Sequence, residues 1–404
     1  MFKASRNIWA LGWVSFFTDL ATAMIKPLIP IYVVLVLNQG MDKLGYVLAI
    51  TTLVSYLFRW LGGWLSDRLQ VTKPLLLAGY GLSAILKPLF AFTTSWVGVA
   101  AISATERLGK AIRSAPKDVL ISASAEQHSQ GRAFGVHKTL DIAGETVGGL
   151  IAFVLLSWLG QSPEWIRFIF EITIIPGVIG VLILIFFVKE RLNTPVKDTV
   201  DESDSEALKK QNRFGNQSVP QVFDVTLWAW FGVYFLAVFF MLNDAFMVMR
   251  GSEIGIATQW LPLLLVVSAL TQTLISYRVG KRLDSHGAKL LLVVSLWAGV
   301  LSVALLFSQN TVAIVIAFVL QGIFMVSGLN ALRARIGQTA YGKGKAYGVF
   351  YLGTAVAMAL GNLIVGQLWE YANVSYALMF SLIGLLLLLF AVSISKNLLQ
   401  AHVD

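Results

Sequence analysis

Charged residues recur at helical spacing inside three apolar stretches of this 404-residue chain. Positions three, four or seven residues apart lie on one face of a helix. The charged faces consist of Asp19 and Lys26, then Glu106, Lys110, Arg113 and Lys117, and then His137, Asp141 and Glu145. A charge at the centre of a bilayer costs about 2.5–3.5 kcal/mol on insertion scales, so each should face a cavity or an opposite charge. These faces are therefore candidate functional sites.

The acids on these faces have the chemistry of a proton carrier. Burial between helices disfavours an ionised carboxylate, so a buried acid can take up a proton from one side and release it to the other. The predicted proton-coupling set is Asp19, Glu106, Arg107, Asp141, Glu145 and Lys138, with Asp19 and Asp141 favoured as carriers. Arg107 or Lys138 would pair with the ionised acid. The alternative is a static ion pair that fixes helix register, and His137 is expected to be solvated or structural and not a proton relay.

Basic residues outnumber acids in the apolar stretches of the first half of the chain. The bases are Lys26, Arg59, Lys87, Arg107, Lys110, Arg113 and Lys138, and the acids are Asp19, Glu106, Asp141 and Glu145. Lys87 and Arg59 are set aside, because long basic side chains can reach the membrane surface. The excess of base favours a substrate with carboxylate or phosphate groups. The predicted substrate cavity contains Lys26, Lys110, Arg113, Asp244, Asn243 and Asn330.

The composition indicates a membrane protein and excludes several classes of site. Hydrophobic residues make up 57% and charged residues 13% of the chain, against about 45–50% and 25% in soluble domains. There is no cysteine, which excludes cysteine-ligated metal sites, and we expect no metal and no cofactor. An enzyme is not indicated, because the sequence has no HExxH, P-loop or GxSxG pattern.

Twelve apolar segments predict an all-α polytopic membrane protein. They are Ile8–Leu37, Leu44–Trp64, Pro74–Phe92, Trp96–Ile121, Ala133–Trp158, Phe168–Val188, Val225–Met249, Ala257–Gly280, Lys289–Phe307, Val312–Ile336, Ala346–Trp369 and Val374–Ile394. Helices are expected because the alternation typical of barrel strands is missing. The polar segment 189–224 is predicted to be a cytoplasmic linker between an N-terminal half, 1–188, and a C-terminal half, 225–404.

The distribution of Lys and Arg predicts the orientation. With the N-terminus in the cytoplasm, about 21 of the 31 basic residues lie on the cytoplasmic side, and only Lys43, Arg167 and Arg250 lie outside. Basic loops favour the cytoplasmic side, so we expect a protein of the cytoplasmic (inner) membrane with both termini in the cytoplasm. The net charge of +9 then requires no nucleic acid partner. The expected partners are the bilayer and a small-molecule substrate, and a monomer is expected.

The two halves contain matching motifs. Gly131-Arg-Ala-Phe-Gly-Val136 recurs as Gly344-Lys-Ala-Tyr-Gly-Val349, and the glycine and aspartate of Gly63-x-x-x-Asp67 recur as Gly280 and Asp284. The offsets, 213 and 217 residues, are nearly equal. Parallel six-helix repeats related by an axis along the membrane normal are a transporter architecture with the substrate site between the halves. We therefore expect two pseudo-symmetric halves of six helices.

One loop resembles a motif of the major facilitator superfamily. The stretch Gly63-Trp-Leu-Ser-Asp67-Arg68, followed by Lys73, resembles the motif between the second and third helices, although Gln70 stands where glycine is common. The resemblance implies the twelve-helix major facilitator fold. Charge-assisted bonds between the halves could lock one access state, so the predicted cytoplasmic gate is Gly63, Asp67, Arg68, Lys73, Gly280 and Asp284. The alternative is that these residues only anchor the loop at the headgroups.

The fifth apolar segment is similar to the antiporter motif of drug/proton exchangers in that superfamily. Its glycines are Gly135, Gly144, Gly148 and Gly149. Gly149 replaces the usual proline and Ala152 the last glycine. The resemblance implies close helix packing at these glycines. It also implies that the first and fourth helices line the cavity beside the fifth, so the three charged faces are expected to meet.

Three hypotheses for function stay open. The first is a proton-coupled exporter of a small organic molecule, driven by an ion gradient and favoured by the glycines of the fifth segment. The second is an importer or exchanger of an organic anion in the same fold, favoured by the basic residues. The third is a membrane sensor that transports nothing, for which no output domain is present. Sodium in place of protons also stays open.

Overall fold

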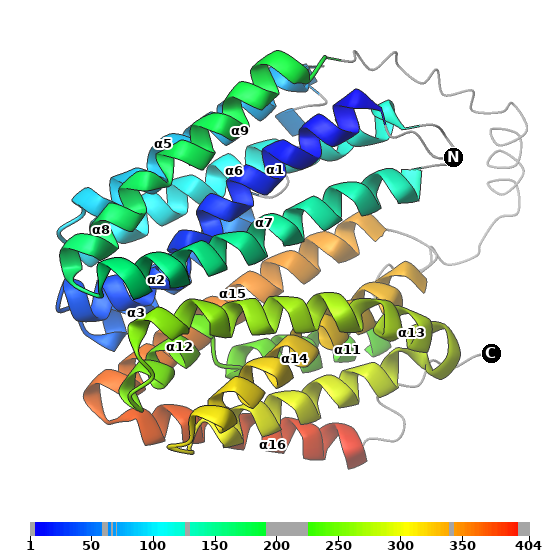
Figure 1. The fold of residues 1–404 in the computed structure, drawn as a ribbon. Coiled ribbons are helices and arrows are strands. Elements are labelled where there is room, and N and C mark those ends of the chain that lie inside the picture. The colour runs from blue at the N-terminus through cyan, green and yellow to red at the C-terminus, as the bar shows by residue number, and fades with distance from the viewer. Residues whose placement is uncertain are drawn as a thin grey trace, which may run out of the picture.

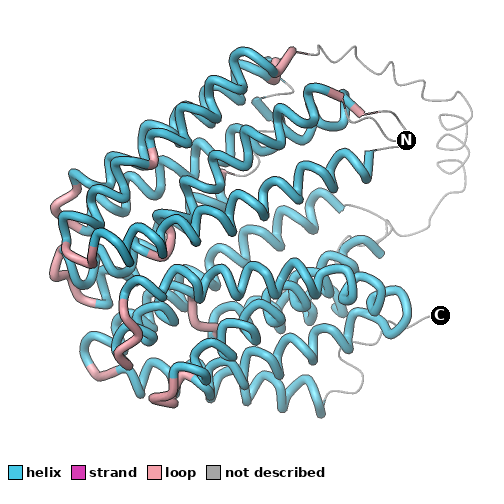
Figure 2. Tube along the Cα trace, in the orientation of Figure 1, coloured by secondary structure: helices cyan, strands magenta, loops and turns pink. Residues whose placement is uncertain are grey.

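The computed structural model describes residues 5–58, 64–65, 68–69, 71–125, 130–190, 225–338 and 343–394; side chains at 130–131, 225, 277–287, 334, 337–338 and 343–345 are not described. Nearly all of this described part is helical, and it contains no strand (Figure 2). The all-α prediction is therefore confirmed.

The helices divide into two groups along the chain. The first group is α1 (Arg6–Ile25), α2 (Leu28–Ile31), α3 (Met41–Leu57), α5 (Lys73–Leu89), α6 (Trp96–Ser124), α7 (Gln130–Leu159), α8 (Pro163–Ile172) and α9 (Ile174–Phe187). The second group is α11 (Val225–Phe240), α12 (Asp244–Glu253), α13 (Leu261–Leu305), α14 (Thr311–Gln338), α15 (Lys343–Tyr371) and α16 (Val374–Ile394). A π-helical turn, Tyr32–Val36, extends α2, and short 3-10 turns lie at Phe90–Phe92 and Thr258–Trp260.

Ten segments of the described chain are long and apolar enough to cross a membrane. Two predicted segments fall outside this set for different reasons: α3 is described over only 17 residues, and α6 carries a run of charges from Glu106 to Asp118. The 45-residue helix α13 contains two of the ten, Thr258–Ser276 and Ala288–Leu305. In Figure 1 this helix runs toward the side of the termini and then turns back, so one continuous helix supplies two spans.

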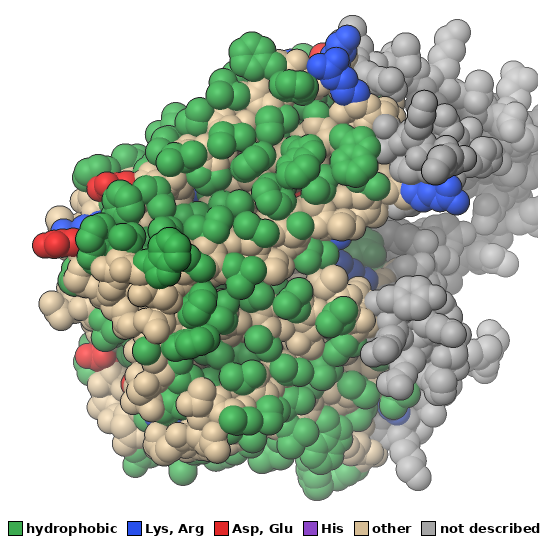
Figure 3. Space-filling view, viewed as in Figure 1, with side chains coloured by type: hydrophobic (Ala, Val, Ile, Leu, Met, Phe, Trp, Pro, Cys, Tyr) green, Lys and Arg blue, Asp and Glu red, His purple; other side chains and the backbone are tan. Residues whose placement is uncertain are grey.

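Apolar side chains cover the outside of the helices (Figure 3). Trp158, Leu274 and Phe186 are 84%, 72% and 71% exposed. The charged side chains in this view lie toward the two ends of the bundle. Such a surface is unfavourable in water and matches the hydrocarbon of a bilayer. Together with the ten apolar spans, it identifies a multi-pass membrane protein.

The first and seventh predicted segments are each interrupted. α1 ends just before Lys26, because the next residue, Pro27, lacks the backbone donor that would continue the helix. α12 starts at Asp244, and Asn243 caps it by accepting a hydrogen bond from the Ala245 backbone N–H at 3.0 Å. Lys26 thus stands at the C-terminal end of a helix and Asp244 at the N-terminal end of another. Helix dipoles favour a cation and an anion at these respective ends.

The two groups touch along two pairs of helices and are joined at one end. α3 packs against α15, and α7 packs against α13. The Met41 backbone N–H donates to Glu370 Oε2 at 2.8 Å, and Gln161 Nε2 donates to Gln259 Oε1 at 2.9 Å. These contacts lie at the end of the bundle opposite the termini, which we call the closed end (Figure 1). At the terminal end, Figure 3 shows a recess between the groups in which Lys or Arg side chains are visible.

The start of the predicted linker is held against the first group of helices. Asn7 Nδ2 donates to the Lys189 carbonyl oxygen at 3.0 Å, and the Lys189 backbone N–H donates to Asn7 Oδ1 at 2.9 Å. Residues 191–224, which make up most of the predicted linker, lie outside the described residues.

Candidate functional site

A cavity lies between the two groups of helices, with an empty volume of about 1020 Å³ that includes its part open to solvent. The charged residues in its lining are Lys26, Lys87, Glu106, Arg107 and Asp244. Its hydroxyl groups come from the first group of helices: Thr22, Thr51, Thr52, Ser55, Tyr56 and Ser103. The second group contributes Asn243 and Asp244, and otherwise the apolar residues Ala245, Val248, Leu265 and Met358. One wall is therefore polar and the other largely apolar.

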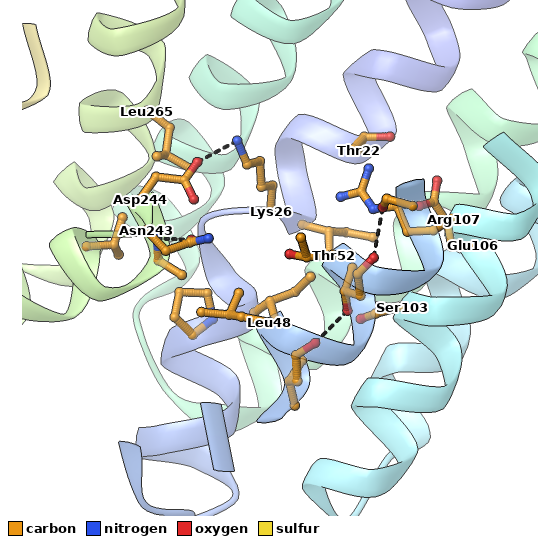
Figure 4. A pocket seen from close by; sticks show the side chains of 18 of the residues that line it. Thr22, Lys26, Leu48, Thr52, Ser103, Glu106, Arg107, Asn243, Asp244 and Leu265 are labelled. Atoms are coloured by element: carbon orange, nitrogen blue, oxygen red, sulfur yellow. Dashed lines mark hydrogen bonds and ion pairs between the residues drawn. The ribbon is translucent and has the colours of Figure 1, made fainter. Parts of the chain in front are cut away.

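An ion pair joins the two groups across this cavity. Lys26 Nζ lies 2.7 Å from Asp244 Oδ2, and the side chains are 42% and 23% exposed (Figure 4). Among the ion pairs between described residues, only this one connects the two groups. The sequence predicts both residues at the cavity but cannot pair them, because they are 218 positions apart. The two helix interruptions bring them together.

Glu106 and Arg107 lie on the opposite side of the cavity from that ion pair (Figure 4). Glu106 is buried and accepts a hydrogen bond from Ser83 Oγ at 3.0 Å. Arg107 Nε lies 3.8 Å from Glu106 Oε2, which is a loose contact. The cavity thus has two charged sides, with the Lys26–Asp244 ion pair on one and Glu106 with Arg107 on the other.

Lys87 also lines this cavity, so the prediction that its side chain reaches the membrane surface is wrong. It is buried, and its Nζ donates to the Thr18 carbonyl oxygen at 2.9 Å. Its stem therefore crosses to α1 instead of reaching the membrane surface. The signal in the sequence was Ser83, one helical turn before Lys87 in an apolar segment, because the two polar residues share one face of α5.

Three residues predicted at the cavity do not line it: Lys110, Arg113 and Asn330. Arg113 is buried between helices, where its Nη1 donates to the Gly79 carbonyl oxygen at 3.0 Å and its guanidinium lies 4.4 Å from the centre of the Tyr80 ring. It therefore holds α6 against α5. Lys110 is exposed and Asn330 is partly buried on α14. Helical spacing shows which residues share a face of α6 or α14, but it does not show which of these faces points toward the cavity.

A second polar cluster lies between α1, α5 and α7, and none of its members lines the cavity. Asp141 Oδ1 lies 3.4 Å from His137 Nδ1. His137 Nε2 lies 2.9 Å from Ser15 Oγ, which lies 3.1 Å from the Tyr80 hydroxyl. We call these four residues the Asp141 chain. His137, expected to be solvated or structural, is buried in the middle of this cluster, so the solvated alternative is wrong. Every member can donate or accept a hydrogen bond.

The other predicted coupling residues surround these two sites. Asp19 on α1 and the exposed Lys138 on α7 both lie close enough to Asp141 to act on its charge. Glu145 lines a small cleft between α1, α7 and α13 that Lys26 also lines. The three charged faces therefore meet only in part. Those of α1 and α6 reach the cavity, whereas α7 contributes mainly to the Asp141 chain.

The glycines of α7 divide into packing and non-packing positions. A Cβ at Gly144 or Gly148 would collide with a backbone carbonyl oxygen of α1, that of Phe16 or Leu20 respectively. A Cβ at Gly149 would collide with the Val266 side chain of α13. Gly135, in contrast, has open space around it. The first three let α7 approach its neighbours closely, as small residues do in membranes, and the packing role predicted for Gly135 is wrong in this structure.

Gly144→Ala should lower the apparent melting temperature of the purified protein. The methyl group would force α1 and α7 apart, and overpacking of this kind costs about 1–3 kcal/mol. Gly135→Ala is the matched control, because its methyl group meets nothing and alanine has the better helix propensity. Equal melting temperatures for the two variants would contradict the packing role of Gly144.

The predicted cytoplasmic gate is described only in part. Gly63 and Asp67 lie outside the described residues, as do the side chains around Gly280 and Asp284. Arg68 is exposed, with its guanidinium 5.1 Å from the centre of the Trp64 ring. The Lys73 backbone N–H donates to Glu190 Oε2 at 2.7 Å, and its Nζ donates to the Ile185 carbonyl oxygen at 2.8 Å. These contacts join Lys73 to the end of α9 and to the residue Glu190 that follows it, and not to the second group of helices.

Known proteins resemble this chain along most of its length. Residues 11–275 match the model of the Major Facilitator Superfamily. An uncharacterized MFS-type transporter of Methanocaldococcus jannaschii is 26% identical over 96% of this chain and 95% of its own length. Multidrug resistance protein MdtG of Dickeya zeae is 27% identical over 48% of this chain and 46% of its own length.

Two crystal structures show the same fold. A mutant of the nucleoside transporter NupG matches with a TM-score of 0.77 at 14% identity, over 96% of this chain and all of its own. A POT family transporter in complex with 5-aminolevulinic acid matches with a TM-score of 0.76 at 11% identity, over 98% of this chain and 97% of its own. At these identities the likeness concerns the fold alone. With the family match, it confirms the predicted fold.

Proposed function

Because this chain belongs to the major facilitator superfamily, we propose that it exports a small organic solute across the cytoplasmic membrane in exchange for protons. The observation that carries the proposal is the cavity between the two groups of helices, with the Lys26–Asp244 ion pair across it. An ion pair that joins the groups on one side must break when they separate there. Its strength therefore biases the equilibrium between two access states.

The position of the cavity supports export. The groups are joined by hydrogen bonds at the closed end, and the recess between them at the terminal end (Figure 3) offers the solute a way in. With both termini in the cytoplasm, as the distribution of basic residues predicts, that end faces the cytoplasm. The similarity of half the chain to a multidrug resistance protein also supports an efflux role.

The Asp141 chain supports proton coupling. Protonation of Asp141 would weaken its contact with His137, which is bonded to Ser15 on α1. Lys26 terminates the same helix α1. A proton on Asp141 can therefore change the position of α1 and, through α1, the strength of the ion pair that joins the two groups. Because the four residues of the Asp141 chain lie outside the cavity, the proton and the solute can be bound at separate places.

Everted membrane vesicles containing the protein test the proposal. The vesicles are acidified inside by respiration, and a fluorescent dye reports the pH gradient while members of a panel of carboxylates, nucleosides and lipophilic cations are added. A transported solute should accumulate in the vesicles and release protons from them, because each transport cycle exchanges one for the other. Vesicles without the protein are the control. Accumulation that persists after the pH gradient is collapsed would contradict proton-driven export.

A further inference from the structure

We propose that Arg107 and Ser103 form a carboxylate-binding subsite in the cavity, so that the solute is an organic monoanion with an apolar body. This inference rests on the proposed function for the movement of the solute, but not for its binding. The anion is then bound by Arg107 and Ser103, and not by Lys110 and Arg113 as the sequence alone predicts.

Arg107 has hydrogen-bonding capacity that the described part of the protein leaves unused. Its described partner is Glu106, which meets the Nε atom at 3.8 Å. The terminal nitrogens of the guanidinium make no hydrogen bond to a described residue. The side chain is 29% exposed, and the residue lines the cavity. A guanidinium presents five N–H donors in a planar fork that matches the two oxygens of a carboxylate.

Ser103 is an independent sign of a ligand at the same place. It precedes Arg107 by four residues, so both lie on one face of α6. The residue is only 6% exposed, lines the cavity, and its hydroxyl has no hydrogen-bond partner among the described residues. A buried hydroxyl without a partner is unfavourable. An oxygen of the solute, held by Arg107 one turn away, would supply the missing partner.

The carboxylate of Glu106 does not satisfy Arg107 in place of a solute carboxylate. Its carboxylate accepts a hydrogen bond from Ser83, and several cations act on its charge: Arg107, Lys87, Arg113 and Lys110. Glu106 is thus already engaged by neighbouring cations, while Asp19 acts on the charges of Lys87 and Lys110. On the other side of the cavity, Lys26 is already held by Asp244 at 2.7 Å. An incoming anion therefore finds Arg107 as the accessible cation with the weakest existing contact.

The remaining lining indicates the rest of the solute. The wall contributed by the second group of helices includes Val248, Leu265 and Met358, and Leu48 adds an apolar surface from α3. Such a wall favours an aliphatic or aromatic body. A carboxylate fits the subsite better than a phosphate, because a single guanidinium and one hydroxyl offer few donors for three charged oxygens. Lys110 and Arg113, which could have added donors, do not line the cavity, and Lys87, which does, is buried with its Nζ on the Thr18 carbonyl oxygen.

The test uses three ligands that share a phenylalkyl body and differ in the head group: 4-phenylbutyrate, 4-phenylbutyramide and 4-phenylbutylamine. Binding to the purified full-length protein in lipid nanodiscs is measured by calorimetry, without any gradient. The carboxylate should bind at least about tenfold more tightly than the amide or the amine, which is the effect of losing a charge-assisted hydrogen bond. Arg107→Gln should remove this preference, and Ser103→Ala should reduce it.

Two further variants separate recognition from general electrostatics. Arg107→Lys keeps the charge but loses the fork, and should weaken binding of 4-phenylbutyrate. Arg132→Gln removes an exposed base of α7 outside the cavity, and should leave the affinity within about twofold. Equal affinity for the three ligands, binding of none of them, or an unchanged affinity in Arg107→Gln would each overturn the subsite. Carboxylate binding through Arg107 without transport would instead contradict the proposed function and leave the subsite standing.

Discussion

Asp141→Asn should abolish proton-driven transport while the protein stays folded. Asparagine has nearly the shape of the acid and can still contact His137, but it cannot take up or release a proton at neutral pH. In proteoliposomes the variant should lose accumulation driven by a pH gradient. It should retain counterflow, the exchange of labelled for unlabelled solute, because that half of the cycle needs no net proton movement. The comparison of these two measurements separates coupling from solute binding.

Glu171→Gln is the matched control for this prediction. Glu171 is an exposed acid on α8, outside both the cavity and the Asp141 chain, and its replacement should leave both measurements unchanged. His137→Gln tests the chain itself, because it interrupts the connection between Asp141 and Ser15. Full pH-driven accumulation by Asp141→Asn would show that the proton is carried elsewhere, with Asp19 as the next candidate.

The second large effect concerns the ion pair between the two groups of helices. Asp244→Asn should open the closed end, because the only described ion pair that connects the groups loses its charge. Truncating a desolvated pair costs about 2–5 kcal/mol. Lys26 is 42% exposed, so screening by water reduces the expected cost to about 1–2 kcal/mol, roughly a tenfold change in the ratio of the closed to the open state at this end.

The absence of cysteine makes this change measurable. Gln161 and Gln259 lie in contact at the closed end, with Nε2 and Oε1 2.9 Å apart, and the chain has no native cysteine to interfere. Cysteines introduced at these two positions should cross-link more slowly in Asp244→Asn, and by at most about tenfold, because the rate follows the population of the closed state. The charge exchange Lys26→Asp with Asp244→Lys should restore part of the rate, because it rebuilds the ion pair but places each charge at the unfavourable end of its helix dipole. Glu164→Gln, which replaces an exposed acid in the first turn of α8, should not alter the rate. Unchanged cross-linking in Asp244→Asn would mean that the pair does not hold the closed end.

Most of the fold could be predicted from the sequence, because a bilayer leaves few choices. Long apolar segments must be helices when no water satisfies their backbone groups, and the described helices follow the predicted segments closely. The departures have local causes. The charges of α6 lower its apolarity below that of an ordinary span, and Pro27 and Asn243 interrupt two segments that read as continuous.

The sequence by itself determined which residues could do chemistry: the acids and bases inside apolar segments, and the face of the helix that each occupies. Only the tertiary structure decided which of them act together. Arg107 reaches the cavity, whereas Arg113, less than two turns away, binds the backbone of α5. Lys26 meets Asp244 from 218 positions away. Helical periodicity fixes the relative direction of side chains on one helix, but the rotation of that helix and the identity of its neighbour are set by packing. Contacts such as those of Gly144 against α1 therefore determine where each charged face points.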